Sequence, residues 1–320
     1  MIQELHYILT LPFRILKELT FDVYMLSDKT KNVTYITSTS VGKVPYFIER
    51  LCENDVTVTK IRRIYAWELR KFVDQQDMVL LDMYKYFACL FDDGFLVPEF
   101  VRQILDIDKP LNEIIKLRDR ELKKVQKYNY EVSNDPDALK FFYEVMYVPH
   151  IKEKYGDLAV DSFHNVRKIF NNGELIFVTF DGKRVSAYLN EMVDSVYALR
   201  RNGILCNNLE KEGAMVAAYY FSILRAKERN AKAVDFGGSK PFLLDGVLRH
   251  KNKWGTKIYA SDTVKRIIYL KNVLFEQPFI YIHGEKIKVA VLSEDDKLIK
   301  EYAGSGLEFD VISKNKLGVQ

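Results

Sequence analysis

The chain has 320 residues, of which 48% are hydrophobic and 29% are charged, and its formal net charge is +4. This composition supplies enough apolar side chains for two domain-sized cores, and it excludes a disordered protein. So small a net charge does not by itself indicate a nucleic-acid or membrane partner.

The cysteines and the start of the chain indicate a reducing compartment. The three cysteines, Cys52, Cys89 and Cys206, are odd in number and lack metal-ligand spacing, so a disulfide framework and a zinc site are both disfavoured. Residues 1–20 carry charged side chains among the apolar ones, which is not typical of a signal peptide or a membrane span. We therefore expect a cytoplasmic protein with no membrane span and no bound metal.

The first third of the chain mixes short strands with amphipathic helices. Residues 33–37 and 78–81 have the composition of strands, whereas residues 44–52 and 65–73 have the apolar spacing of helices. We expect residues 1–110 to form an N-terminal α/β domain.

A charged segment follows this domain. Residues 111–127 place their apolar side chains on one stripe between many charges, which predicts a helix with a single buried face. We expect residues 111–130 to be a bridging helix and residues 131–320 to form a second domain.

The second domain is expected to begin with helices and a hairpin. Asn134-Asp135-Pro136 combines an N-cap with a following proline and predicts a helix that ends at Pro149. A further helix is predicted at residues 158–170. Asp181-Gly182 between two apolar runs predicts a hairpin turn. Residues 212–231 predict a long helix that leads into a strand, as in a mixed sheet.

The last third alternates between strands and helices. We predict a strand at residues 257–260, a helix with Asp262 as its N-cap, a hairpin around Gly284, a helix at residues 295–302 and a strand at residues 307–312.

Positive charge is concentrated in residues 249–271. This run holds seven basic side chains and one acid, Asp262, a local excess larger than the net charge of the whole chain. One interpretation is a docking site for an anion, and the other is a solvated face of a basic helix.

Four segments carry a resemblance to a known family. They are FVRQILDIDKPLNEIIKLRDRELKKVQKYNYEV at 100–132, FFYEVMYVPHIKEKYG at 141–156, GELIFVTFDGKRVSAYL at 173–189 and VDFGGSKPFLLDGVLRHKNKWG at 234–255. They resemble segments of the GNAT superfamily of acyltransferases, in its FemAB-like branch. The resemblance implies two GNAT-like halves, the second more complete and followed by a short α/β extension. It also implies transfer of an acyl group from an anionic carrier to an amine.

The resemblance places the carrier at the start of the helix predicted at 212–231. Lys211, Gly213 and Ala214 occupy the position where backbone N–H groups of GNAT enzymes hold the pyrophosphate of coenzyme A. The usual string, Gln or Arg followed by two residues and Gly-x-Gly or Gly-x-Ala, is absent. Acyl-coenzyme A is the carrier we expect. Aminoacyl-tRNA, the donor of FemAB ligases, is the alternative, and a catalytically silent binding protein for a peptide or glycan is a third interpretation.

Two residues are candidates for the chemistry. Lys251 matches the lysine of the family's Lys-x-x-Trp/Phe-Gly segment, where a fixed cation stabilises the oxyanion that forms during acyl transfer. A phosphate clamp and an ordinary surface lysine are its alternatives. Asp235 ends an apolar strand, where a carboxylate can accept the amine's proton or cap the next turn. Four residues are expected to bind the acceptor amine: Ser239, Asp245, Arg249 and Trp254.

Overall fold

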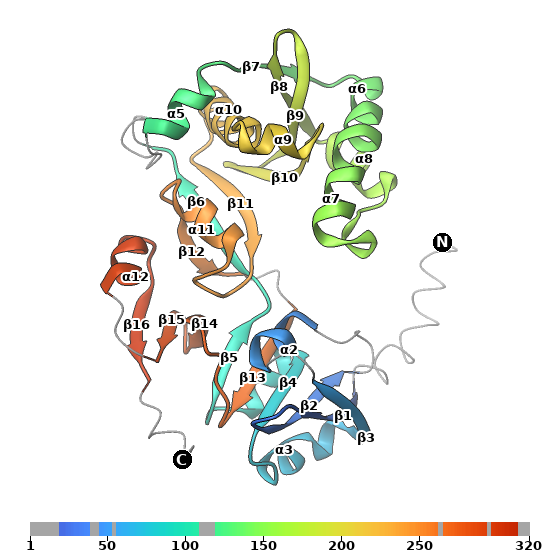
Figure 1. Ribbon diagram of the computed structural model, residues 1–320, viewed down its shortest axis with the longest axis vertical. Coiled ribbons are helices and arrows are strands. Elements are labelled where there is room, and N and C mark those ends of the chain that lie inside the picture. Colours follow the sequence, from blue (N-terminus) through green and yellow to red (C-terminus); the bar gives the residue numbers. More distant parts are fainter. Residues whose placement is uncertain are drawn as a thin grey trace. The chain divides into compact units, whose positions relative to one another are not determined.

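The computed structural model describes residues 19–38, 45–52, 56–108, 119–261, 265–292 and 296–312 (Figure 1). They form two compact units. Unit 1 comprises Met1–Val101, Ser239–Arg249 and Tyr259–Gln320, and unit 2 comprises Arg102–Gly238 and His250–Ile258. The expected α/β class with mixed sheets is confirmed, since each unit is built on a sheet that contains parallel and antiparallel pairs.

Unit 1 has a sheet of nine strands within the described residues, in the order β16-β15-β14-β5-β13-β4-β2-β1-β3. Its strands are β1 (Thr20–Ser27), β2 (Asn32–Ser38), β3 (Thr57–Tyr65), β4 (Val79–Tyr84), β5 (Phe95–Pro98), β13 (Arg266–Lys271), β14 (Phe279–His283), β15 (Lys286–Val291) and β16 (Glu308–Val311). Its helices are α2 (Pro45–Leu51), α3 (Ala66–Asp74), η1 (Lys85–Leu90) and α12 (Asp296–Glu301). Apolar clusters cover both faces of this sheet.

The C-terminal residues complete the sheet of unit 1. β13 lies between β4 and β5 and pairs antiparallel with both. The prediction of a helix after Asp262 is wrong, because residues 266–271 form this buried strand. Asp262 itself lies outside the described residues. The sheet therefore joins residues 266–311 to the first hundred residues, unlike the expected division at residues 111–130.

Unit 2 has a sheet of seven strands in the described part of the chain, in the order β12-β6-β11-β10-β9-β8-β7. Its strands are β6 (Val101–Asp106), β7 (Asn129–Ser133), β8 (Gly173–Phe180), β9 (Lys183–Val193), β10 (Val196–Ile204), β11 (Ala233–Ser239) and β12 (Lys257–Ala260). The predicted hairpin at Asp181-Gly182 is confirmed: both residues have positive φ, as a tight two-residue turn between β8 and β9 requires.

The helices of unit 2 are α5 (Asp119–Val125), α6 (Pro136–Phe141), η2 (Phe142–Tyr147), α7 (Val148–Tyr155), η3 (Asp157–Ala159), α8 (Phe163–Phe170), α9 (Asn207–Lys211) and α10 (Ala214–Glu228). Helix α11 (Gly246–Asn252) begins in unit 1 and ends in unit 2, which takes over at His250. The helix begun by the Asp135 N-cap does not end at Pro149 as predicted. A π-helical turn, η2, precedes the proline, which then occupies the first turn of α7. A proline is tolerated there because a first-turn N–H has no intrahelical partner.

The bridging helix expected at residues 111–130 is described only in part. Residues 119–125 are helical as α5, and residues 109–118 lie outside the described residues. Among the described helices, none is both long enough and apolar enough to cross a membrane.

Candidate functional site

The candidate site lies in unit 2, where two neighbouring strands separate. β10 and β11 run parallel, but they pair only from Val196↔Ala233 to Ala198↔Asp235. Beyond these three pairs the strands diverge, as Figure 1 shows, while the chain between them forms α9 and α10. The strands on either side of this long helix are therefore separated beyond Asp235.

Lys251 lies at the far end of β11. Its side chain extends from α11, and its ammonium group donates a hydrogen bond of 2.8 Å to the carbonyl oxygen of Gly238. The residue is only 5% exposed, so it is not an ordinary surface lysine. A cation held in a largely dehydrated position exerts a stronger field than one in bulk water.

A cluster of aromatic side chains packs beside Lys251. The ring of Tyr219, from α10, lies 5.2 Å from that of His250 and 5.1 Å from that of Tyr188, between centroids. Phe236 and Trp254 contact the same tyrosine, at 5.2 and 5.8 Å. Burial, reinforced by the positive charge of Lys253, lowers the pKa of His250 to about 4. The imidazole next to Lys251 is therefore neutral near pH 7 and can accept a hydrogen bond.

A surface pocket of about 530 Å³ lies between α7 and α9. It is lined by Glu153, Lys154, Glu210 and Lys211. Lys154 and Glu210 form an ion pair of 3.0 Å across it. The charges of both also act on His250, so this pocket belongs to the same side of unit 2 as the aromatic cluster.

The predicted donor loop is closed in this structure. The N–H groups of Glu212 and Gly213 already donate to carbonyl oxygens of α9, and Ala214 is completely buried. Lys124 of α5 donates to the carbonyl oxygen of Lys211 at 2.7 Å and packs against Gly213. Lys211, Gly213 and Ala214 therefore do not present the row of accessible N–H groups that a pyrophosphate requires.

Asp235 has two structural partners. Its Oδ1 accepts the N–H of Gly237 at 2.9 Å, and its Oδ2 pairs with the guanidinium of Arg102 at 2.8 Å. The side chain is 5% exposed. This geometry matches the turn-capping interpretation and leaves neither carboxylate oxygen unengaged for a proton transfer.

The four residues expected to bind the acceptor occupy different environments. Asp245 caps α11 by accepting the N–H groups of Val247 and Leu248, each at 3.0 Å. Arg249 forms a two-pronged ion pair with Glu301. Ser239 is 2% exposed and Trp254 is completely buried. Trp254 thus packs in the core of unit 2, and its ring offers no surface to a ligand.

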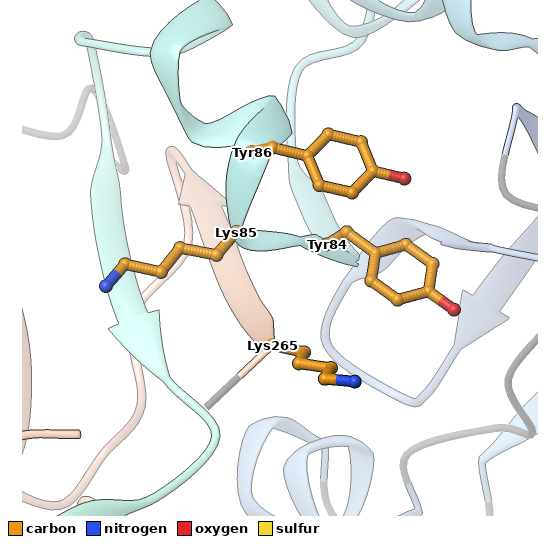
Figure 2. Close-up of a pocket in the computed structure, with 4 residues that line it drawn as sticks. All are labelled: Tyr84, Lys85, Tyr86 and Lys265. Carbon is orange, nitrogen blue, oxygen red and sulfur yellow. The ribbon is translucent and has the colours of Figure 1, made fainter. Parts of the chain in front are cut away.

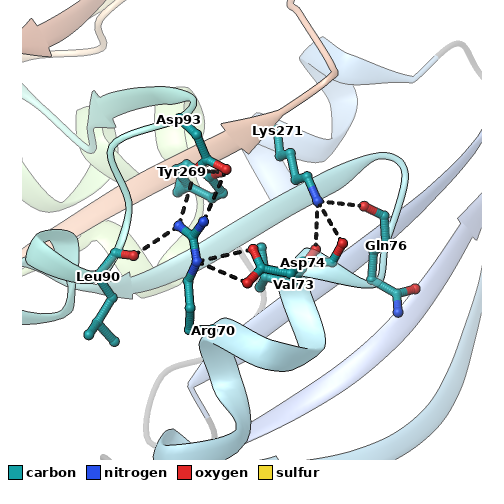
Figure 3. A network of polar contacts seen from close by, with 8 residues as sticks. All are labelled: Arg70, Val73, Asp74, Gln76, Leu90, Asp93, Tyr269 and Lys271. Carbon is teal, nitrogen blue, oxygen red and sulfur yellow. Dashed lines mark hydrogen bonds and ion pairs between the residues drawn. The ribbon is translucent and has the colours of Figure 1, made fainter.

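The basic run 249–271 is not the face of one helix. It contains the end of α11, strand β12 and strand β13. Lys257 pairs with Asp106, and the buried Arg266 pairs with Asp82. Figure 3 shows that the ammonium of Lys271 donates to three backbone carbonyls at the C-terminal end of α3 and just beyond it, those of Val73, Asp74 and Gln76. Local partners therefore neutralise much of this charge, and the interpretation of the run as one solvated helix face is wrong.

Little in the sequence indicates the aromatic cluster. Tyr188 and Tyr219 lie in apolar runs that predict core positions, and the structure buries both. Only the non-local packing of β9, α10 and α11 brings them to His250. Among the described residues, no group of histidine, cysteine and acidic side chains is arranged to hold a metal ion.

Comparison with known proteins finds similar solved structures. FemX is 15% identical over 79% of this chain and 84% of that chain, with a TM-score of 0.44. L-PGS from Bacillus licheniformis is 13% identical over 79% and 80%, with a TM-score of 0.37. A GCN5-related N-acetyltransferase from Kribbella flavida is 12% identical over 74% and 80%, with a TM-score of 0.32. No protein-family model and no curated protein matches the chain. At these identities and TM-scores the likenesses assign no activity to it.

Proposed function

We propose that the chain is an acyltransferase that moves an acyl group from an anionic carrier to an amine, in unit 2. The observation that carries this proposal is the position of Lys251, buried at the end of β11 beyond the point where β10 and β11 separate. The resemblance of residues 234–255 to the FemAB-like branch supports it independently of the geometry.

The chemistry required is attack by a neutral amine on the carbonyl carbon of the acyl group. A C–N bond forms, the carbonyl oxygen becomes an oxyanion, and the bond to the carrier then breaks as the leaving group takes a proton. Lys251 is the cation that stabilises the oxyanion. His250, neutral near pH 7, accepts a hydrogen bond from the incoming amine. With a pKa of about 4 it is a weak base, so the amine's proton passes to water.

The closed loop before α10 bears on the identity of the carrier. A coenzyme A pyrophosphate needs accessible N–H groups at the start of that helix, and those of Glu212 and Gly213 are engaged. Aminoacyl-tRNA does not need that loop for a pyrophosphate. The geometry therefore favours aminoacyl-tRNA over acyl-coenzyme A, the carrier expected from the sequence.

A donor assay tests the proposal. The purified chain is incubated with acetyl-coenzyme A or with a mixture of aminoacyl-tRNAs, in the presence of amino acids, amino sugars and short peptides as amine acceptors. We expect amine-dependent loss of the acyl group from aminoacyl-tRNA, with weaker or no release of coenzyme A. A folded chain that consumes neither donor would contradict the proposal and would favour a silent binding protein.

A further inference from the structure

A second pocket lies in unit 1, apart from the proposed acyl-transfer chemistry. Its volume is about 520 Å³, and the four described residues that line it are Tyr84, Lys85, Tyr86 and Lys265 (Figure 2). Tyr84 ends β4, Lys85 and Tyr86 begin η1, and Lys265 immediately precedes β13. The N–H of Lys85 donates to the carbonyl oxygen of Lys265 at 2.7 Å, which ties the two sides of the pocket together.

The two tyrosines form a prearranged aromatic wall. Their ring centroids are 5.4 Å apart and the ring planes differ by only 7°. The guanidinium of Arg266 lies 5.2 Å from the ring of Tyr84, and Phe87 supports Tyr86 at 4.6 Å. Tyr86 is nevertheless 55% exposed. An exposed ring held by such neighbours can stack on a planar ligand with little loss of side-chain entropy.

Two lysines, Lys85 and Lys265, add positive charge beside the tyrosine rings. Figure 2 shows the hydroxyl groups of Tyr84 and Tyr86 and the ammonium of Lys265 pointing the same way, while Lys85 extends to the opposite side. Across the described residues, neither lysine ammonium forms an ion pair. Asp82, the acid on the same strand, is buried and already paired with Arg266. The pocket therefore presents cationic charge beside an aromatic surface.

We infer that this pocket binds a nucleotide unit, in which a planar base stacks on Tyr86 and a phosphate contacts Lys265. Stacking on aromatic rings combined with lysine contacts to phosphate is how proteins hold nucleotides without reading their sequence. The volume lies within the range of small-ligand sites. The same chemistry is offered by a free nucleotide and by a nucleotide within a single strand. The inference does not depend on the acyl-transfer proposal.

Calorimetric titration of the full chain tests it, with adenosine 5′-monophosphate, adenosine, inorganic phosphate and a single-stranded ten-residue oligoadenylate as probes. We expect the monophosphate to bind more tightly than adenosine or phosphate alone. Tyr86→Ala and Lys265→Ala should each weaken this binding about tenfold, since stacking and phosphate contacts each contribute on that order. If the oligonucleotide alone binds, with the same sensitivity to both variants, the source of the nucleotide is a strand.

Matched controls separate the pocket from general surface effects. Tyr65→Ala removes another exposed, stacked tyrosine of unit 1, and Lys29→Ala removes another exposed lysine; both should leave binding unchanged. The inference is overturned if no nucleotide probe binds, if phosphate alone binds as tightly as the monophosphate, or if the pocket variants bind like the wild type. Because none of these measurements involves a donor or an amine, failure here is distinguishable from failure of the acyl-transfer proposal.

Discussion

The ammonium of Lys251 donates a hydrogen bond to the carbonyl oxygen of Gly238 at 2.8 Å and so joins α11 to the end of β11. The contact fixes a positive charge next to the place where β10 and β11 part. It also gives Lys251 a role in packing, so experiments on this residue must separate folding from catalysis.

Asp235 should contribute to stability and not to turnover. Asp235→Asn keeps an acceptor for the N–H of Gly237 but loses the charge paired with Arg102. We expect the free energy of unfolding to fall by roughly 1–3 kcal/mol, as for a buried charged hydrogen bond, while turnover changes by no more than a few-fold. Urea unfolding and steady-state kinetics measure both. Asp106→Asn, in an exposed pair with Lys257, serves as the control and should cost less than about 1 kcal/mol. A large loss of turnover with unchanged stability would instead make Asp235 the general base.

His250 should make the protein sensitive to mild acid. Burial lowers its pKa to about 4 from the ordinary 6.5, so between these values the unfolded chain binds the proton and the folded chain does not. Stability contributed by the neutral imidazole is therefore complete above pH 6.5 and is lost as the pH falls toward 4, by up to about 3 kcal/mol.

The variant His250→Asn tests this dependence. Its free energy of unfolding should change less between pH 6.5 and 4.5 than that of the wild type, as measured by urea unfolding at each pH. Burial also lowers the pKa of His150, so some slope remains in both proteins. His164→Asn, at an exposed position, should keep the slope of the wild type. Equal slopes in His250→Asn and the wild type would contradict the prediction.

Removing only one charge of the buried ion pair between Asp82 and Arg266 should lower the free energy of unfolding substantially. Arg266→Met leaves the Asp82 carboxylate buried, where the hydroxyl of Thr37 donates a hydrogen bond of 3.1 Å to it, and we expect the free energy of unfolding to fall by roughly 3–5 kcal/mol. Asp82→Asn combined with Arg266→Met removes both charges and should recover a substantial part of that loss. Denaturant unfolding of the three proteins checks this, and a double variant less stable than Arg266→Met would refute it.

Gly203 should tolerate no side chain. A Cβ at this position of β10 would lie 2.8 Å from the carbonyl carbon of Met146 and 2.9 Å from the backbone nitrogen of Tyr147, in the π-helical turn η2. Because backbone atoms cannot yield as a flexible side chain does, Gly203→Ala should cost about 1–3 kcal/mol. Gly246→Ala, where a Cβ meets nothing within 4 Å, should be neutral or slightly stabilising in thermal unfolding. Equal melting temperatures for the two variants would contradict this account.

Local features of the fold could be predicted from the sequence. The Asp181-Gly182 turn, the Asp135 cap and the long helix α10 depend on neighbouring residues, and the structure contains all three. Features set by distant contacts could not be predicted. The placement of β13 between β4 and β5 pairs residues more than 160 positions apart.

The same distinction between local features and distant contacts applies to the candidate site. The motif around Lys251 is contiguous and therefore visible in the sequence. The partner of Asp235 is Arg102, 133 residues away, so its structural role appears only in the folded chain. The closed loop at Gly213 likewise depends on Lys124, which approaches from another helix.

Steady-state kinetics of Lys251→Met, once a donor is identified, test the central claim most directly. Methionine keeps most of the buried stem and removes the charge, and Lys253→Met, at a neighbouring exposed lysine, is the control. We predict a fall in kcat of about 100- to 1000-fold, typical of losing one oxyanion donor, with near-normal unfolding and an unchanged Lys253→Met. Lys251→Arg should recover only part of the activity, since its planar group differs in shape. An unchanged kcat with a raised donor KM would make Lys251 a phosphate clamp, and a folded Lys251→Met with wild-type kcat and KM would contradict the proposed role altogether.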